Sequence, residues 1–209
     1  MKVRFKKYTL NFKRPSGTSR GVLRQKETYF IEITDGNRRG LGECGLFRGL
    51  SYDDVPGFEA QLAAVCKALE VGEDTSALCA NYPSIQMGVE MALLSFNSLT
   101  PFQLFNTAFS RGQQPIAING LVWMGDVSFM RQQVFDKIDA GFDCIKLKIG
   151  ALDFEVECQL LAEIRERYPA KDVTLRVDAN GAFSPDEALE KLKILAEFDL
   201  HSIEQPIAA

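Results

Sequence analysis

Apolar and polar residues alternate with a period of two in three short runs near the start of the chain. The runs are VRFKKYTLNF at 3–12, ETYFIEIT at 27–34 and RRGLGECG at 38–45, and alternation of this kind predicts β-strands. Asp-Gly-Asn between the last two favours a tight hairpin, because Asp-Gly and Gly-Asn accept positive φ angles. Apolar residues then recur at helical spacing over 57–70 and 83–99, which predicts two helices. This part of the chain therefore has the pattern of an α+β unit.

After residue 112 the pattern changes to strands that alternate with helices. Strands are predicted at 116–125, 144–150, 172–180 and 202–207, and amphipathic helices at 126–141, 153–169 and 184–198. Such alternation is typical of βα units around a parallel sheet. Ser-Pro-Asp-Glu at 184–187 combines an N-cap serine, a proline and acidic residues, which marks a helix start. We expect two domains, an α+β capping domain at 1–112 and a βα domain at 113–209.

The composition is that of a globular protein and excludes several partners. The chain has 209 residues, of which 46% are apolar and 25% charged, and a net charge of −4. Without a concentrated Lys/Arg block, this charge argues against nucleic acid or an anionic membrane as the main partner. No apolar run approaches the roughly 18 residues of a membrane helix, and no signal peptide opens the chain, so we expect a cytoplasmic protein.

Cysteine and histidine usage narrows the chemistry further. The five cysteines are odd in number and scattered without Cys-x-x-Cys spacing, which predicts free, mostly buried thiols rather than disulfides or zinc ligands. The single histidine, His201, removes most Ser-His and Cys-His catalysis and most zinc sites.

Charged and amide side chains gather at the ends of three successive predicted strands of the βα domain. They are Lys146 and Lys148, then Arg176, Asp178 and Asn180, then Glu204 and Gln205. Side chains of a strand alternate between its two faces, so the two lysines share one face, as do Arg176, Asp178 and Asn180. In a parallel βα array the carboxyl ends of all strands open on one side, where ligands bind.

Each of these residues also has a structural explanation when taken alone. The lysines could reach solvent from an edge strand, Asp178 and Asn180 could form a turn, and Glu204 could end a strand. Their joint occurrence at equivalent strand ends favours a site instead. Two neighbouring carboxylates repel unless a cation neutralises them, and hard oxygen ligands without histidine or thiolate indicate Mg²⁺. A lysine beside a divalent cation and a second ammonium favours its neutral form and can act as a base.

These motifs resemble the enolase superfamily, specifically its muconate lactonizing enzyme subgroup. The segment KLK at 146–148 is similar to the subgroup's paired lysines on the second barrel strand, RVDAN to its first metal-ligand motif, and EQP to its second. The resemblance implies a capping domain followed by a (β/α) barrel. It also implies that Lys148 is the proton-abstracting base and Lys146 its electrostatic partner. Asp178 and Glu204 would be Mg²⁺ ligands, with Arg176 and Asn180 lining the site.

The capping domain resembles that of o-succinylbenzoate synthases. RPSGTSRGVL at 14–23 falls where the family has a mobile specificity loop, and GLGECGLFRGLSYDD at 40–54 is similar to a second cap loop. Ser19 and Arg20 would contact the substrate, a small-molecule carboxylate, which these enzymes dehydrate to o-succinylbenzoate in menaquinone biosynthesis. The alternatives are a dipeptide epimerase or N-acylamino acid racemase and, from another class, a non-catalytic truncated scaffold.

The chain ends after only four of the eight strands that a barrel of this type contains. The resemblance implies a third metal ligand and a lysine on the opposite side of the substrate, both in positions beyond Ala209. We therefore expect the fold class to be an α+β capping domain followed by the first half of an enolase-like (β/α) barrel, in a truncated chain.

Overall fold

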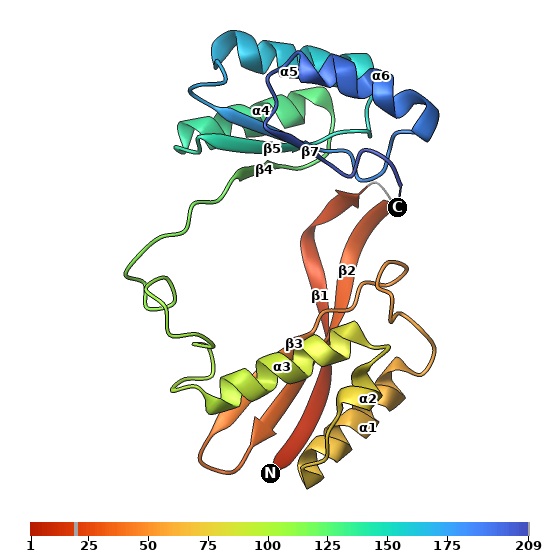
Figure 1. Ribbon diagram of the computed structural model, residues 1–209, viewed down its shortest axis with the longest axis vertical. Coiled ribbons are helices and arrows are strands. Elements are labelled where there is room, and N and C mark those ends of the chain that lie inside the picture. The colour runs from red at the N-terminus through yellow and green to blue at the C-terminus, as the bar shows by residue number, and fades with distance from the viewer. Residues whose placement is uncertain (19–20, 209) are drawn as a thin grey trace. The chain divides into compact units, whose positions relative to one another are not determined.

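The computed structural model describes residues 1–18 and 21–208, and of residues 16–18 it describes the backbone only. The chain forms two compact units (Figure 1). Residues 1–15 and 23–116 make up the first unit, which we call the cap. Residues 117–209 make up most of the second, which we call the half-barrel.

The cap consists of a meander of three strands followed by helices. The strands are β1 (Lys2–Thr18), β2 (Gly21–Thr34) and β3 (Arg39–Cys44), in the order β1-β2-β3. The helices are α1 (Phe58–Val71), α2 (Ser76–Cys79) and α3 (Pro83–Asn97). Strands β2 and β3 pair antiparallel across a turn in which the Asp35 carboxylate accepts hydrogen bonds from the amides of Asn37 and Arg38. The predicted hairpin is confirmed.

The strands β1 and β2 extend further than their sequence pattern predicts. Residues 15–18 and 21–23, which we expect to belong to a loop, have strand geometry. Residues 19 and 20, at the centre of that segment, lie outside the described residues. The four-residue helix α2 is also not predicted, because so short a segment shows no helical period.

Helix α3 packs against β3 at unusually short range because the contact is made of glycines. A Cβ atom added to Gly42 would lie 1.9 Å from the carbonyl oxygen of Gly88, and one added to Gly40 would lie 2.3 Å from that of Ala92. Glycine is thus required at these positions by the close approach of two backbones. The helix buries Ile85, Ala92 and other apolar residues against the strand.

We expect Gly42→Ala to destabilise the cap by about 3 kcal/mol, because backbone cannot move aside as a flexible side chain can. Urea denaturation followed by circular dichroism would measure this loss. Gly45→Ala is the matched control on the same segment, since the nearest atom to its added Cβ is Lys26 Nζ at 3.6 Å. A stability for Gly42→Ala within about 1 kcal/mol of the control would contradict the packing described here.

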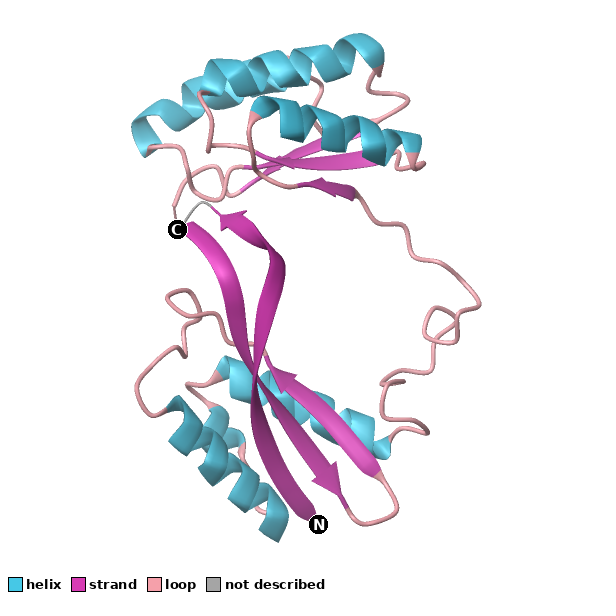
Figure 2. Ribbon diagram, turned by 180° about the vertical axis from the view of Figure 1, so that it is seen from behind, coloured by secondary structure: helices cyan, strands magenta, loops and turns pink. Residues whose placement is uncertain are grey.

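The half-barrel alternates strands and helices. Its elements are β4 (Gly120–Val122), α4 (Val127–Asp139), β5 (Cys144–Lys148), α5 (Phe154–Arg167), β6 (Thr174–Asp178), α6 (Pro185–Ala196) and β7 (Ser202–Glu204). The strands are parallel and lie in the order β4-β5-β6-β7. All three helices lie on the same face of this sheet (Figures 1 and 2). The α+β cap and the parallel βα arrangement confirm the predicted fold class.

One strand length and one helix cap predicted for the half-barrel need correction. The strand predicted at 116–125 is reduced to Gly120–Val122, and Ile116 and Ile118, whose alternation suggested a longer strand, are exposed. Helix α6 begins where Ser184 and Pro185 indicate. The Ser184 side chain, however, makes no capping hydrogen bond to the helix backbone, and its Oγ instead donates to the Glu187 carboxylate.

The face of the sheet that meets the helices carries the core of the half-barrel. Ile145, Leu147, Leu175 and Val177 point to that face and are almost fully buried. The opposite face receives the residues between them, including the two lysines and Asp178. The alternation in the sequence therefore divides each strand into a core face and a polar face.

The cysteines are free, as their spacing predicts. Cys44, Cys66 and Cys79 are buried in the cap, and Cys144 and Cys158 are half-buried in the half-barrel. Among the described residues, no helix combines the length and the apolar character needed to cross a membrane.

Candidate active site

Strand register brings the predicted polar residues into two adjacent rows on the polar face. In the row nearer the carboxyl ends, Lys148 on β5 pairs with Asp178 on β6, and Asp178 pairs with Glu204 on β7. In the row below, Lys146 pairs with Arg176, and Arg176 with Ser202. Aligned residues of neighbouring strands point to the same face, so the two rows form one continuous polar surface.

Both lysines contact the same buried carboxylate. Lys148 Nζ lies 2.9 Å from Asp178 Oδ2 and donates a second hydrogen bond of 2.8 Å to Asn180 Oδ1. Lys146 Nζ lies 3.5 Å from the same Asp178 oxygen and hydrogen-bonds the Glu204 carboxylate. Asp178 is 2% exposed, and the two lysine side chains are about one-fifth exposed. The predicted repulsion between the ammonium groups is thus offset by shared carboxylate partners.

The local backbone directs Asn180 toward Lys148. Asn180 has a φ of 47°, a left-handed conformation that asparagine tolerates better than most residues. Its amide N–H donates to Asp178 Oδ1 at 3.0 Å, which turns the chain back at the end of β6. The turn that could explain Asp178 and Asn180 by itself therefore exists, and it also places the Asn180 side chain in the lysine cluster.

Two groups of the cluster have shifted pKa values. The hydrogen bond from Lys146 to Glu204 raises the pKa of Lys146, an effect that partial burial opposes and Asp178 supports. Burial by itself would raise the pKa of Asp178, but the hydrogen bonds from Lys148 and from the Asn180 amide outweigh it, so this pKa lies below its ordinary value. The charged forms of both residues are therefore favoured within the cluster.

Asp178 and Glu204 both contact one cationic group of the cluster. The ammonium group of Lys146 forms ion pairs with both carboxylates, so one positive group interacts with both. Carboxylate oxygens are the ligands that Mg²⁺ prefers. Within residues 1–18 and 21–208, no three His, Cys, Asp or Glu side chains gather into a metal site. By their type, the Asp178 and Glu204 carboxylates fit Mg²⁺ as two of its ligands.

The remaining predicted residues have different outcomes. Arg176 lies in the lower row, and its Nε is buried without a hydrogen-bond partner in the described part of the chain. Ser19 and Arg20, predicted to bind substrate, lie outside the described residues.

Glu157 is a buried acid on α5 that the sequence pattern did not single out. It lies in the first turns of α5, is 3% exposed, and accepts hydrogen bonds from backbone amides of the turn that follows β5. Acidic residues are common at the start of exposed helices because they favour the helix dipole, so nothing in the helical pattern distinguishes this one. The nearby Gly150, in a turn directly after a strand, is the one available signal.

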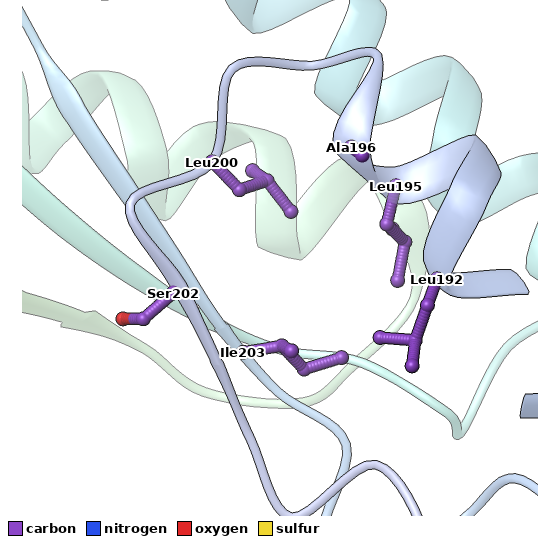
Figure 3. A pocket seen from close by; sticks show the side chains of 6 residues that line it. All are labelled: Leu192, Leu195, Ala196, Leu200, Ser202 and Ile203. Atoms are coloured by element: carbon purple, nitrogen blue, oxygen red, sulfur yellow. The ribbon is translucent and has the colours of Figure 1, made fainter. Parts of the chain in front are cut away.

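An apolar hollow also lies between α6 and β7 (Figure 3). It is lined by Leu192, Leu195, Ala196, Leu200, Ser202 and Ile203. None of these side chains is ionisable, and the hollow contains no residue of the lysine–carboxylate cluster. We therefore place the candidate site at the cluster and not at this hollow.

Comparison with known families covers most of the chain. Residues 2–96 match the family described as MenC, N-terminal domain, and residues 130–209 match the family described as enolase C-terminal domain-like. The second match contains both lysines and both carboxylates of the cluster.

Individual relatives agree with these matches. An o-succinylbenzoate synthase of Desulfotalea psychrophila is 38% identical over an alignment that covers 99% of this chain and 65% of the relative. A crystal structure of MenC from the same organism superposes with a TM-score of 0.85 at 33% identity, covering 99% of this chain and 64% of that one. This chain therefore spans a little less than two thirds of the length of these relatives.

A more distant structure shares the fold. It is an o-succinylbenzoate synthase of Thermosynechococcus elongatus complexed with Mg in its active site. The match has a TM-score of 0.75 and 23% identity, and it covers all of this chain and 62% of that one. With a MenC-type N-terminal domain followed by an enolase-type half-barrel, the chain belongs to the enolase superfamily.

Proposed function

We propose that the protein expressed from its complete gene, called the complete protein below, is a Mg²⁺-dependent o-succinylbenzoate synthase. It would dehydrate a cyclohexadiene carboxylate in menaquinone biosynthesis, in the cytoplasm. The observation that carries this choice is the MenC-type N-terminal domain over residues 2–96. The half-barrel alone would not decide it, because the resemblance implies the same paired lysines for epimerases.

The chemistry follows from the residues of the polar face. Lys148 Nζ would remove the proton on the carbon next to the substrate carboxylate to give an enediolate. The protonated Lys148 would then return this proton to the hydroxyl group, which leaves as water. The positive charge of Lys146, one row below, would stabilise negative charge as it develops on the substrate. Asn180 would orient Lys148 through the hydrogen bond of 2.8 Å between Lys148 Nζ and Asn180 Oδ1.

Asp178 and Glu204 would hold Mg²⁺. When bound, the ion would neutralise charge on the substrate carboxylate, which favours loss of the neighbouring proton. The contact of one Lys146 ammonium with both carboxylates supports this assignment. Arg176 would line the same surface with its buried Nε, and Ser19 and Arg20 would contact the substrate.

A substrate comparison tests the proposed reaction. The complete protein with Mg²⁺ would be incubated with the cyclohexadiene acid and, separately, with a panel of dipeptides. We expect dehydration with a kcat/KM of at least about 10⁴ M⁻¹s⁻¹, at the low end of typical enzymes, and no comparable epimerisation. Faster turnover of a dipeptide would identify an epimerase, and no turnover of any substrate would identify a non-catalytic scaffold.

A further inference from the structure

Glu157 binds three consecutive backbone amides with one buried carboxylate. Its Oε1 accepts hydrogen bonds from the amides of Gly150 at 2.8 Å, Ala151 at 3.2 Å and Leu152 at 3.1 Å, and its Oε2 accepts from Gly150 at 2.9 Å. Hydrogen bonds to an ionised acceptor are roughly twice as strong as neutral ones, and burial strengthens them further. The turn at 150–152 is therefore held by a single side chain.

The buried Glu157 carboxyl group lies beside groups that favour its charged form. Burial raises the pKa of Glu157 above its ordinary value, and the three amides and the positive charge of Lys191 oppose this rise only in part. Lys191 on α6 packs over the ring of Phe154, which precedes Glu157 by one turn of α5. Burial therefore opposes the charged form of Glu157, and the hydrogen bonds from the three amides and the charge of Lys191 support it.

The turn held by Glu157 packs against the turn that carries Asn180. Gly150 has a φ of +91°, and a Cβ atom added there would lie 2.3 Å from Ala182 Cβ and 3.3 Å from the carbonyl oxygen of Ala179. Between them, the Ile149 amide donates to the Asp178 carbonyl oxygen at 2.9 Å. A shift of residues 149–152 would therefore change the relative positions of β5 and the end of β6.

We propose that Glu157 is a positioning residue for Lys148. By fixing the turn that begins two residues after Lys148, its carboxylate keeps Lys148 Nζ between Asp178 and Asn180, at 2.9 and 2.8 Å. The effect of Glu157 on turnover rests on the proposed function, whereas its effect on the position of Lys148 does not.

The test compares Glu157→Gln with Glu155→Gln in the complete protein. Glutamine keeps the volume of the side chain but offers one acceptor oxygen and directs an NH₂ group toward amide donors. Glu155 lies in the same first turn of α5 and is exposed, so its replacement removes the same charge without affecting the turn. Circular dichroism would verify that both variants are folded.

Two readouts separate positioning from general stability. The first is labelling of Lys148 by acetic anhydride, quantified by peptide mass spectrometry relative to exposed Lys171. We expect at least about threefold faster labelling of Lys148 in Glu157→Gln and no change in Glu155→Gln. The second is a kcat for dehydration lowered about 10- to 100-fold by Glu157→Gln, with KM within about twofold, because substrate contacts remain while the base is misplaced.

The outcomes are distinct. Lys148 labelling within twofold of wild type in Glu157→Gln would overturn the proposal whatever the activity, and so would faster labelling with an unchanged kcat. If Glu157→Gln speeds the labelling of Lys148 but the wild-type protein turns over no substrate, the proposed function is refuted. The role of Glu157 in positioning Lys148 is then still supported. If Glu157→Gln does not fold, Gly150→Ala perturbs the same turn with Glu157 intact and must give the same two effects.

Discussion

Replacing Lys148 with alanine is expected to abolish turnover of the complete protein while its fold is retained. Loss of a general base commonly lowers a rate by about 10² to 10⁴, and among the described residues no other base lies where Lys148 Nζ does. The fold should survive because Asp178 keeps the Lys146 ammonium at 3.5 Å and the Asn180 amide at 3.0 Å as partners. The measurement is kcat on the cyclohexadiene acid, together with a circular dichroism spectrum.

Two further variants serve as comparisons for Lys148→Ala. Lys146→Ala should also be severely impaired, through loss of positive charge rather than loss of the base. Lys171→Ala, which removes an exposed lysine before β6, should leave kcat unchanged. If Lys148→Ala retained more than a tenth of the wild-type kcat, Lys148 would not be the base.

Removal of the metal is expected to have an effect of similar size. Treatment of the complete protein with EDTA should eliminate turnover, and added Mg²⁺ should restore it. Without a cation, the negative charges of Asp178 and Glu204 would repel the substrate carboxylate. Asp178→Asn should weaken Mg²⁺ binding by at least about 100-fold, because it removes a charged ligand. Loss of a residue that only hydrogen-bonds a metal ligand already lowers metal affinity about 10- to 100-fold. Isothermal titration calorimetry would measure the affinity.

Asp172→Asn is the control for charge, because Asp172 is exposed just before β6, the strand that ends at Asp178. Its Mg²⁺ affinity should equal that of the wild type. Full activity after EDTA treatment would be incompatible with a role for the metal, and an unchanged affinity in Asp178→Asn would exclude this residue as a ligand.

Much of the fold follows from local pattern because each strand of the half-barrel has one core face and one polar face. The alternation Ile145, Lys146, Leu147, Lys148 specifies which side chains meet the helices, and the structure agrees. The lengths of the strands are harder to predict. The alternation at Ile116 and Ile118 predicts a strand, but the backbone pairs with β5 only at Gly120–Val122. Strand pairing depends on a neighbouring strand and not on alternation alone.

For the candidate site, residue types and faces could be predicted, but contacts could not. Alternation places Lys148 and Asp178 on the polar face, whereas their alignment across β5 and β6 depends on strand register, which is a tertiary property. Glu157 could not be found because its role arises from the turn at 150–152 folding back onto α5. The pairing of Lys146 with Glu204 depends likewise on register, here across two strand boundaries.

The central claim, that Asp178 and Glu204 hold one Mg²⁺ beside the Lys146–Lys148 pair, is tested most directly by a crystal structure of the complete protein grown with Mg²⁺. We expect one ion with an oxygen of each carboxylate at about 2.0 to 2.1 Å and Lys148 Nζ directed toward the open side of the site. An ion bound elsewhere, or carboxylates that remain paired only with the lysines at saturating Mg²⁺, would contradict the account.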